Sequence, residues 1–525
     1  MAELRVGTRV MYGDRRGTVC FVGALHSSEH PGIFAGICWD ESQPGLHDGV
    51  FRGIRYFQCR PSSGSFIPMS KLNQGETIIA ALMEKYGTPA DTHLGVSFGN
   101  KEVLAVGWEK VMKKISNLER LTLVDLTGLN VCIPMPLKDD LSQLIPNVRS
   151  LGLGRSLIGC WSTVMSLIQS LPRLDALDLS DNRLAFDVDL HSSPANSRVK
   201  KLVLRKNVLV WEDVIRISEM FPRLEELYLS ENCIHSCGNP AVVGNNFSTL
   251  KLIDLDSQSP PIADWNALDP LGRCVSLESL QLSGNNIGEI SFSGTSAGSK
   301  TDLFSNLTHL TIKLNALKTW SSVDELNKLK TLENLKITGN SFLDSESPET
   351  ARQWIVAKIA NLKMLNQSPI STSERRDSEL DYMRHFAREY LSCSGNDERR
   401  SLFLSRHPRF LDIVARLGPL EQDEVIPASA IQLTPAPLTV TLQHHDCQHQ
   451  KTIPPTISVM KLKRIFQRLF REPLEVAQVL AYKTPSQPGV EFVLDDDQKE
   501  IAHYDLRSGD TIFLKSGNER VPVVF

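Results

Sequence analysis

Leucines recur at a nearly constant spacing through the middle of the chain and dominate its pattern of apolar and polar positions. Six segments follow the string Leu-x-x-Leu-x-Leu-x-x-Asn-x-Leu or a close variant: Leu174–Leu184, Val199–Leu209, Leu224–Ile234, Leu277–Ile287, Leu307–Leu317 and Leu332–Phe342. Weaker copies start at Leu118, Val148 and Leu250, and successive starts lie 25 to 30 residues apart. A period of this length indicates repeated units that cannot bury their apolar face alone and therefore stack.

Each of the six strong copies carries an asparagine directly after its predicted strand. These residues are Asn182, Asn207, Asn232, Asn285, Asn315 and Asn340. The side-chain amide can satisfy backbone groups that a sheet leaves open where the chain bends. This combination resembles the leucine-rich-repeat family, which implies an α/β solenoid over 118–345 with one strand per unit in a curved parallel sheet. Because the last unit would expose its apolar side, we expect a solenoid cap and helical segment over 346–422.

Residues 1–75 have a different pattern, with many glycines, aromatic residues and short strand-like runs. A Gly-Ile-Cys-Trp-Asp strand spans 36–40, a five-residue signature spans 45–49, and Gly53, the Tyr56-Phe57 pair, Gly64 and Phe66 follow in order. Together they resemble the CAP-Gly domain family along nearly the whole segment. The resemblance implies a small β-barrel that recognises the acidic, aromatic-ended C-terminal tails of α-tubulin and of some microtubule plus-end proteins.

The same resemblance places a tubulin-tail binding site on one set of positions. These are Phe34, Trp39, Gly45, Leu46, His47, Asp48, Gly49, Arg52, Phe57 and Phe66. Glycines let a peptide backbone approach closely, and an aromatic groove can hold a terminal ring. Arg52, Arg55 and Arg60 are near enough in sequence to help neutralise acidic residues.

The signature itself departs from the family pattern, which is usually Gly-Lys-Asn-Asp-Gly. Here Leu46 replaces the lysine, and His47 must supply the hydrogen bond that the asparagine would give. A neutral imidazole offers one donor and one acceptor, so His47 can take that role. We therefore expect weaker binding of a peptide ending in Glu-Glu-Tyr than a lysine-bearing relative shows. The alternative is a barrel that keeps the fold without binding a tail.

In each repeat the leucines point into the core, so the intervening positions face the open, concave side of the solenoid. The candidate contact residues on this concave face are Asp178, Lys201, Arg205, Glu226, Tyr228 and Asp254. Charges of both signs in bands suit a partner with mixed charges of its own. The alternative is ordinary solvation of an exposed sheet.

The remaining segments complete a multidomain organisation. Residues 76–117 predict a helical linker that leads into the solenoid, with a helix near 76–86, and the proline-containing segment 423–437 predicts a second linker. The segment 438–525 alternates like a strand at 438–444, forms an amphipathic helix near 456–470 and adds further strands. This order resembles the ubiquitin-like β-grasp (α+β) family. The sequence finishes without Gly-Gly, so we expect a docking module rather than a conjugated one.

Composition argues against several classes of function. The net charge of −4 argues against nucleic-acid binding, no apolar run is long enough for a membrane span, and the N-terminus does not resemble a secretory signal. Ten cysteines without a CxxC pair predict reduced thiols in the cytoplasm. The segment 291–300 ends Gly-Ser-Lys but lacks the order of a phosphate loop, and we expect the histidines at 444–449 to lie in a solvated loop without a metal. The sequence therefore predicts a binding protein that is not an enzyme and needs no cofactor.

The order of the three modules, over about this length, resembles the family of tubulin folding cofactors. The resemblance implies a cytoplasmic, cytoskeleton-associated chaperone that binds α-tubulin and works with the other cofactors, which carry β-tubulin. Together they would assemble, and can dissociate, the αβ heterodimer. A ubiquitin-like end further implies contact with the proteasome or ubiquitin machinery. The alternative is a microtubule-associated adaptor that binds tubulin tails without a folding role.

Overall fold

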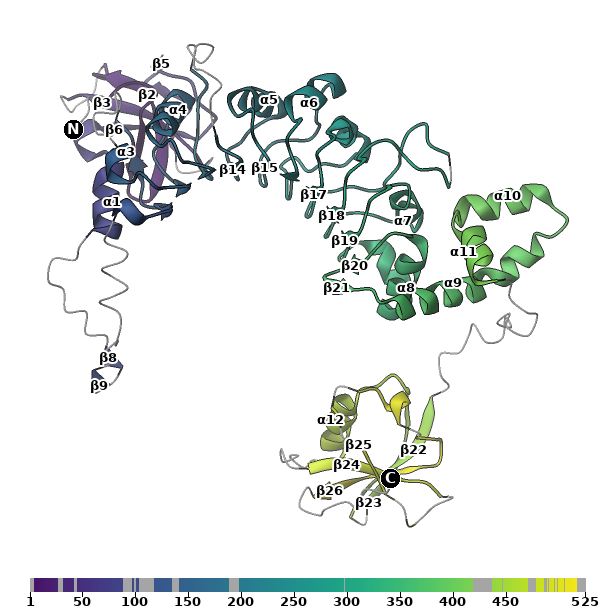
Figure 1. The fold of residues 1–525 in the computed structure, drawn as a ribbon. Helices are drawn as coiled ribbons and strands as arrows, with labels where there is room; N and C mark the ends of the chain where they lie inside the picture. The colour runs from purple at the N-terminus through teal and green to yellow at the C-terminus, as the bar shows by residue number, and fades with distance from the viewer. Residues whose placement is uncertain are drawn as a thin grey trace. The chain divides into compact units, whose positions relative to one another are not determined.

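The computed structural model forms two compact units, 1–420 and 421–525, and each is described by itself (Figure 1). The structure describes residues 4–26, 32–41, 45–87, 97–98, 101–102, 118–134, 141–187, 198–296, 298–418, 437–445, 447–470, 478–485, 489, 491–494, 496–497, 499–504 and 506–516. The predicted linker at 423–437 lies outside the described residues except for Pro437, as does most of the lead-in beyond residue 87.

The first unit opens with a small antiparallel barrel. Its four-stranded sheet has the order β1-β2-β3-β6, formed by Arg9–Tyr12, Arg15–Gly23, Phe34–Trp39 and Gly64–Pro68. A hairpin of β4 (Val50–Phe51) and β5 (Ile54–Arg55) turns through Arg52 and Gly53, which both have positive φ. One face of the sheet buries Val10, Val19, Ala35, Ile37 and Trp39, and the short helix η1 (Met69–Lys71) follows β6.

An eleven-stranded sheet forms the body of this unit. Its strands in spatial order are β10 (Leu123–Asp125), β12 (Ser150–Gly152), β13 (Ala176–Asp178), β14 (Lys201–Val203), β15 (Glu226–Tyr228), β16 (Leu252–Asp254), β17 (Ser279–Gln281), β18 (His309–Thr311), β19 (Asn334–Lys336), β20 (Met364–Leu365) and β21 (Ser368–Pro369). The strands run parallel from β10 to β20, and only β21 is antiparallel. The central residue of each three-residue strand is buried, because the leucine spacing turns that position inward.

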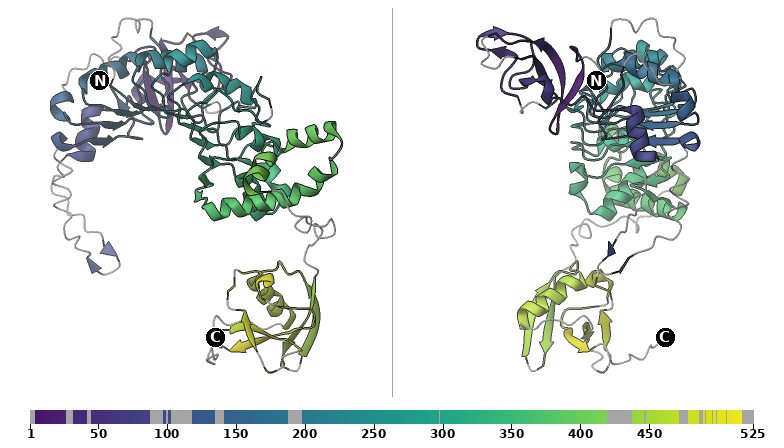
Figure 2. Two further views of the ribbon diagram at one scale, coloured as in Figure 1. Left: turned by 45° about the vertical axis from the view of Figure 1, so that its right-hand side comes forward. Right: turned by 90° about the vertical axis from the view of Figure 1, so that its left-hand side faces the viewer.

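Short helices pack behind this sheet, so that the strands line the inner side of a curve and the helices its outer side (Figures 1 and 2). They are α3 (Leu141–Leu144), α4 (Trp161–Ser170), α5 (Trp211–Met220), α6 (Pro240–Asn246), η4 (Trp265–Arg273), α7 (Ser321–Leu326) and η5 (Ser341–Ser345). Trp161, Trp211 and Trp265 each start a helix and are almost fully buried. These large side chains fill the space between neighbouring units.

The asparagines of the repeats form a continuous chain of hydrogen bonds, which we call the asparagine ladder. Nδ2 of Asn232 donates to the carbonyls of Leu204 and Leu229, each at 2.8 Å. Its Oδ1 accepts from the backbone N–H of Asn207 at 2.9 Å and of Leu209 at 3.0 Å. Because every amide group is paired, these buried polar residues join neighbouring repeats without an unsatisfied atom.

One detail of the repeats differs from the sequence prediction, and a second was not predicted. The first copy starts at Leu121 rather than Leu118, because Val124 pairs with Leu151 and takes the buried central position, whereas 118–120 form the short helix η2 (Leu118–Arg120). In the unit that starts at Leu250, Gln258 replaces the asparagine of the ladder. Its Nε2 donates to the carbonyl of Leu229 at 2.9 Å, and its Oε1 accepts from Ile234 at 3.1 Å.

The two edges of the sheet end differently. Helix α1 (Ile78–Tyr86), which lies within the predicted helix at 76–86, places the hydroxyl of Tyr86 3.0 Å from the backbone N–H of Asp125 on β10. Just before it, β7 (Glu76–Thr77) pairs with β11 (Val131–Cys132), while β8 (Ser97–Phe98) and β9 (Lys101–Glu102) pair with each other. At the far end the sheet stops at β21, whose Pro369 has no N–H to offer another strand.

The predicted cap is a bundle of α8 (Pro348–Lys358), α9 (Thr372–Ser392), α10 (Asp397–Arg406) and α11 (Phe410–Leu417). It has its own core around Trp354, Tyr382 and Phe403. Among the described residues, no helix has the length and apolar character needed to cross a membrane. In the segment 291–300, Lys300 donates to the carbonyl of Asn327, so its ammonium group has a structural contact.

The second unit is a five-stranded sheet with one long helix, α12 (Val459–Phe470), which is the β-grasp arrangement. The strand order is β23-β22-β26-β24-β25, formed by Cys447–Ile453, Leu438–His444, Thr511–Ser516, Gln478–Lys483 and Phe492–Leu494, with η7 (Ile501–His503) before β26. The central pair β22 and β26 is parallel. Cys447 and His449 lie within β23 and not in the predicted loop, because the turn is only two residues long. Within the described part of the chain, no group of side chains is arranged to hold a metal ion.

Candidate peptide-binding site

The barrel carries a cluster of aromatic side chains on the face opposite its core. Phe66 on β6 lies at the centre, with ring centroids 4.8 Å from His47, 5.4 Å from Tyr56 and 5.4 Å from Phe57. The rings of Phe21 and Phe51 lie 6.3 and 5.9 Å from it. Most pairs meet edge to face, the arrangement that aromatic quadrupoles favour. Phe57 is buried and the other rings are half-buried, so the cluster offers apolar surface to an incoming aromatic side chain.

Glycine at position 36 makes this cluster possible. A Cβ at Gly36 would lie only 2.4 Å from the ring of Phe57, and Gly36 pairs with Phe66 across β3 and β6. At Gly49, which has a φ of +100°, a Cβ would lie 2.0 Å from the carbonyl oxygen of Phe57. Glycine is therefore required at both positions, because any side chain would clash with Phe57.

The signature loop at 45–49 is held by its own backbone. His47 pairs with Gly64 in a short bridge, and its Nδ1 accepts from the N–H of Gly49 at 3.0 Å. Burial lowers the pKa of His47, and Asp48 opposes this only in part, so the imidazole is neutral at pH 7. With Nδ1 as the acceptor, Nε2 carries the proton and is the donor left for a ligand. Leu46 is 88% exposed and offers an apolar tip where the family has a cation.

Two of the nearby arginines already have partners within the barrel. Arg55 donates from Nη2 to Oδ2 of Asp48 at 2.8 Å, and this contact lowers the pKa of Asp48. The guanidinium of Arg52 lies 5.6 Å from the ring centre of Phe51. The hydrogen bond of Arg55 braces the signature loop, so its charge is partly neutralised before any ligand arrives.

The structure separates the predicted groove residues into two sets. Phe57 and Phe66 belong to the aromatic cluster, and His47 joins them. Trp39 does not, because alternation along β3 turns it into the core, where it is 4% exposed and donates from Nε1 to Ser65 at 2.9 Å. Phe34, at the other end of β3, is half-buried on the same face as Gly36. The sequence reading missed Phe21, whose position on this face depends on the β-bulge between Val19 and Phe21.

The concave face of the solenoid gathers four of its six predicted residues around Tyr228. Lys201 lies 4.6 Å from the centre of the Tyr228 ring and 3.0 Å from Glu226, and Arg205 approaches the same ring at 5.4 Å. Asp178 lies in register with Tyr228 two strands away. A tyrosine flanked by two cations is a rigid, partly apolar contact point, of the type enriched in protein interfaces.

Asp254 lies on the concave face in register with Tyr228, but it departs from the prediction because it is only 2% exposed. Its carboxylate accepts from Ser230 at 3.0 Å and pairs with Arg205 at 3.3 Å, which covers it. Burial, together with the charge of Asp254, raises the pKa of the neighbouring Asp256 to about 6. The two neighbouring carboxylates repel each other, and Arg205 pairs with Asp254.

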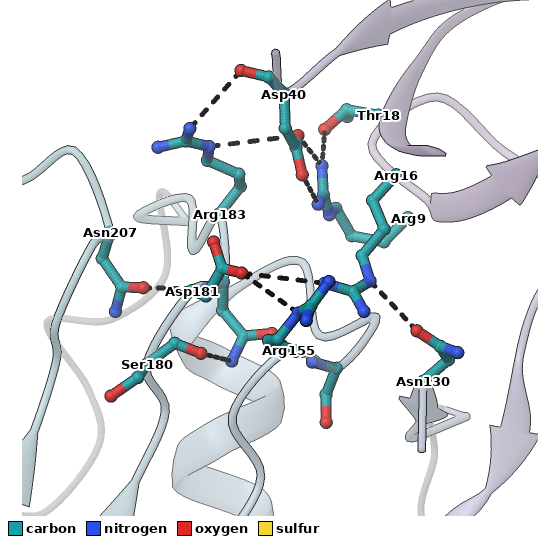
Figure 3. Close-up of polar contacts among 12 residues, drawn as sticks. Arg9, Arg16, Thr18, Asp40, Asn130, Arg155, Ser180, Asp181, Arg183 and Asn207 are labelled. Atoms are coloured by element: carbon teal, nitrogen blue, oxygen red, sulfur yellow. Dashed lines mark hydrogen bonds and ion pairs between the residues drawn. The ribbon is translucent and has the colours of Figure 1, made fainter. Parts of the chain in front are cut away.

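A third polar site lies where the barrel meets the first repeats, as Figure 3 shows. Asp40 at the end of β3 binds Arg9 in a bidentate pair and lies 3.9 Å from Nε of Arg183. Arg16 on β2 donates to Asn130 at 3.0 Å and lies 3.8 Å from Asp181. A closer ion pair joins Asp181 to Arg155 on the neighbouring turn, at 3.4 Å.

These contacts join residues of the barrel to the turns that follow β10, β12 and β13. The partners that cross from the barrel to the solenoid, such as Arg16 with Asn130 and Asp40 with Arg183, are separated by more than one hundred positions in the sequence, and no local motif marks them. The barrel is therefore docked on the solenoid through charged groups that the sequence pattern did not identify. A high local density of arginine is the only signal that the sequence offers for them.

Comparison with known proteins gives a consistent result. Residues 6–72 match the family model of the CAP-Gly domain. The chain is 32% identical to tubulin-specific chaperone E of Pongo abelii, over 97% of this chain and 98% of that protein. It is 29% identical to tubulin-folding cofactor E of Arabidopsis thaliana, over 97% of both.

Among solved structures, the second unit is similar to the C-terminal ubiquitin-like domain of mouse tubulin-specific chaperone e. The two are 22% identical, and the match covers 16% of this chain and 92% of that domain, with a TM-score of 0.15.

Proposed function

Because this chain belongs to the family of tubulin-specific chaperone E, we propose that it is a tubulin-folding chaperone that binds α-tubulin. With the other tubulin cofactors, which carry β-tubulin, it assembles the αβ heterodimer and can also dissociate it. The observation that carries the proposal is a family likeness that spans 97% of the chain and so includes all three modules. The place of action is the cytoplasm and its cytoskeleton, and the protein acts by binding and not by covalent chemistry.

The first contact in this proposal is the aromatic cluster around Phe66, which holds the end of the α-tubulin tail. Its half-buried rings supply apolar surface, and Nε2 of His47 supplies a hydrogen-bond donor at the edge of that surface. CAP-Gly domains as a family recognise acidic tails that end in an aromatic residue. The geometry of the cluster supports that ligand class for this chain as well.

The second contact is the concave face around Tyr228, which holds the folded body of the same α-tubulin molecule. Lys201 and Arg205 flank the ring, so the surface pairs apolar area with charge. Two weak contacts on one ligand raise its effective concentration at the second site and multiply the affinity. The proposal assigns the ubiquitin-like unit to docking with the proteasome or ubiquitin machinery.

The experiment mixes the full chain with purified, unpolymerised αβ-tubulin and follows complex formation by size-exclusion chromatography, together with the polymer mass at 37 °C. We expect a complex and a lower polymer mass. Phe66→Ala should weaken the complex about tenfold without abolishing it, because the second contact remains. Phe492→Ala, at a 38% exposed phenylalanine in the second unit, is the matched control and should leave binding unchanged.

The adaptor alternative makes a different prediction for the same mixture. An adaptor would pellet with microtubules and leave the polymer mass unchanged. If the full chain ignores unpolymerised tubulin altogether, the chaperone proposal is wrong.

A further inference from the structure

The contact between barrel and solenoid has more positive than negative charge. We call it the junction and define it by five arginines, Arg9, Arg16, Arg60, Arg155 and Arg183, and two carboxylates, Asp40 and Asp181. Asp40 serves both Arg9 and Arg183, and Asp181 serves both Arg16 and Arg155. Arg60 is exposed and has no ion-pair partner within the described residues. The arginines therefore outnumber the carboxylates that could neutralise them.

The pKa of Arg183 and the unpaired hydrogen-bond donors both indicate that the arginines of the junction are not fully paired. Burial lowers the pKa of Arg183, and the neighbouring guanidinium groups of Arg9 and Arg60 lower it further, against the opposing effect of Asp40. Nη1 of Arg183 and Nε of Arg9 are buried without a hydrogen-bond partner in the described part of the chain. Guanidinium donors that lack acceptors and repel one another are stabilised by added negative charge.

The junction lies beside the signature loop of the aromatic site. Gly45 donates its N–H to the carbonyl of Ser62 at 3.1 Å, and Leu46 donates to Gly64 at 2.8 Å. The same short segment carries Ser63, whose N–H donates to the carbonyl of Arg60 and whose carbonyl accepts from Trp39, the residue before Asp40. Leu46 is thus joined through this segment to Arg60 on one side and to Asp40 on the other.

We propose that the junction binds the acidic segment of an extended peptide whose aromatic end lies in the cluster around Phe66. Arg60 from the barrel and Arg155 and Arg183 from the solenoid supply the positive charge that Leu46 does not. The site is composite, because two of these three arginines belong to the repeats. The inference rests on the proposed function, since the peptide is the acidic tail of the proposed client.

The arginines to substitute are those whose side chains are exposed and can reach a ligand. Arg155 and Arg60 are exposed, with 60% of the Arg155 side chain accessible, whereas only 12% of the Arg16 side chain is accessible and it helps to hold the barrel in place. Arg149 is a matched control for Arg155. It stands before β12 and Arg155 after it, its side chain is 65% exposed, and it pairs with one carboxylate, Asp175, at 2.8 Å. Replacing Arg149 therefore removes an equivalent positive charge at the opposite end of β12.

The experiment measures binding of a fluorescent peptide, rich in glutamate and ending in tyrosine, to the full chain by anisotropy at low and moderate salt. Each of Arg60→Gln and Arg155→Gln should weaken binding about two- to fivefold, and the double variant should also show a smaller salt dependence. Arg149→Gln should bind like the unaltered chain, and Arg155→Lys should keep most of the affinity. A peptide with glutamine in place of all its glutamates should bind the double variant and the unaltered chain equally.

Two results would overturn the inference and can be told apart. If the double variant binds the acidic peptide as well as the unaltered chain while Phe66→Ala does not bind it, the junction is not part of the site and the aromatic contact stands. If the unaltered chain binds no acidic peptide although it captures tubulin, the tail contact itself is wrong and the solenoid carries the proposed function. Thermal unfolding of each variant establishes that its fold is retained.

Discussion

The asparagine ladder of the solenoid and the junction beside the barrel are both buried or half-buried polar networks, but they differ in balance. In the ladder, Asn232 has a donor or an acceptor for each atom of its amide, and all groups are neutral. In the junction, Asp40 and Asp181 each serve two arginines, and buried donors of Arg9 and Arg183 lack acceptors.

The difference separates what holds the fold together from what is left for a ligand. A neutral, fully paired network stabilises the chain equally over a wide range of pH and salt, because nothing in it titrates or is screened. The stability of a network with surplus positive charge depends on pH and on salt, and a bound anion increases it. Incomplete pairing therefore marks the junction, and not the ladder, as a place where a partner can act.

The ladder should give the largest effect. Asn232→Ala leaves the carbonyl of Leu204 and two backbone N–H groups unpaired in the core, while the carbonyl of Leu229 keeps its bond from Gln258, so we expect a loss of about 3–5 kcal/mol in the free energy of unfolding. Urea denaturation followed by circular dichroism measures it. Asn361→Ala removes one exposed hydrogen bond, to the carbonyl of Lys330, and should cost less than about 1 kcal/mol. Equal losses would mean that the ladder adds nothing beyond ordinary surface contacts.

A substitution in the junction should lower the free energy of unfolding less than the ladder variant does. Its main effect should be on how firmly the barrel docks on the solenoid. Asp40→Asn removes the carboxylate charge that faces Arg183 of the solenoid at 3.9 Å and that also pairs with the 1% exposed Arg9, and we expect docking to weaken by about 2–4 kcal/mol. Faster hydrogen–deuterium exchange should appear at the barrel strands while the ladder amides are unchanged. Asp302→Asn, at an exposed aspartate paired with Lys330, is the control and should change neither. Unchanged exchange in the Asp40 variant would show that other contacts fix the barrel.

Asp256 allows a smaller test within the solenoid. Its pKa of about 6 in the folded chain lies above the ordinary aspartate value of about 3.9, so its stabilising contribution is complete below about pH 4 and is lost as the pH rises through 6. Asp256→Asn should therefore raise stability by about 1–2 kcal/mol at pH 7.5, since the amide can still accept from the N–H of Ser283. Denaturation at pH 7.5 and pH 4 measures the difference. A gain that is the same at both pH values would exclude titration of Asp256 as its cause.

The repeat pattern was predictable from the sequence because each leucine has the same role in every unit. The prediction was wrong, or did not extend to a residue, where contacts with a neighbouring unit decide which side chain is buried or paired. Gln258 takes an asparagine position because its longer amide reaches the same carbonyl, and Asp254 is buried because Arg205 from another unit covers it. The first copy shifted to Leu121 because pairing with β12, rather than leucine spacing, sets which residue points inward.

The aromatic site could be predicted in part. Family resemblance identified Phe57, Phe66 and the signature loop, since motif positions are fixed in order. It placed Trp39 in the groove, although the two-residue period of β3 turns that side chain to the core. The junction could not be predicted, because its ion pairs depend on how the barrel sits on turns far along the chain. Whether the cluster and the junction bind a tail stays a prediction.

The two edges of the eleven-stranded sheet also bear on how the molecule can associate. At one edge the hydroxyl of Tyr86 accepts a hydrogen bond from the backbone N–H of Asp125 on β10. At the other edge the sheet stops at the two-residue strand β21, which contains Pro369. In the residues that the structure describes, these features interrupt the row of free backbone groups at each edge, which disfavours pairing of the sheet with a second copy. The described sheet therefore has a fixed size of eleven strands, and this size sets the width of the curved surface that the proposed client could contact.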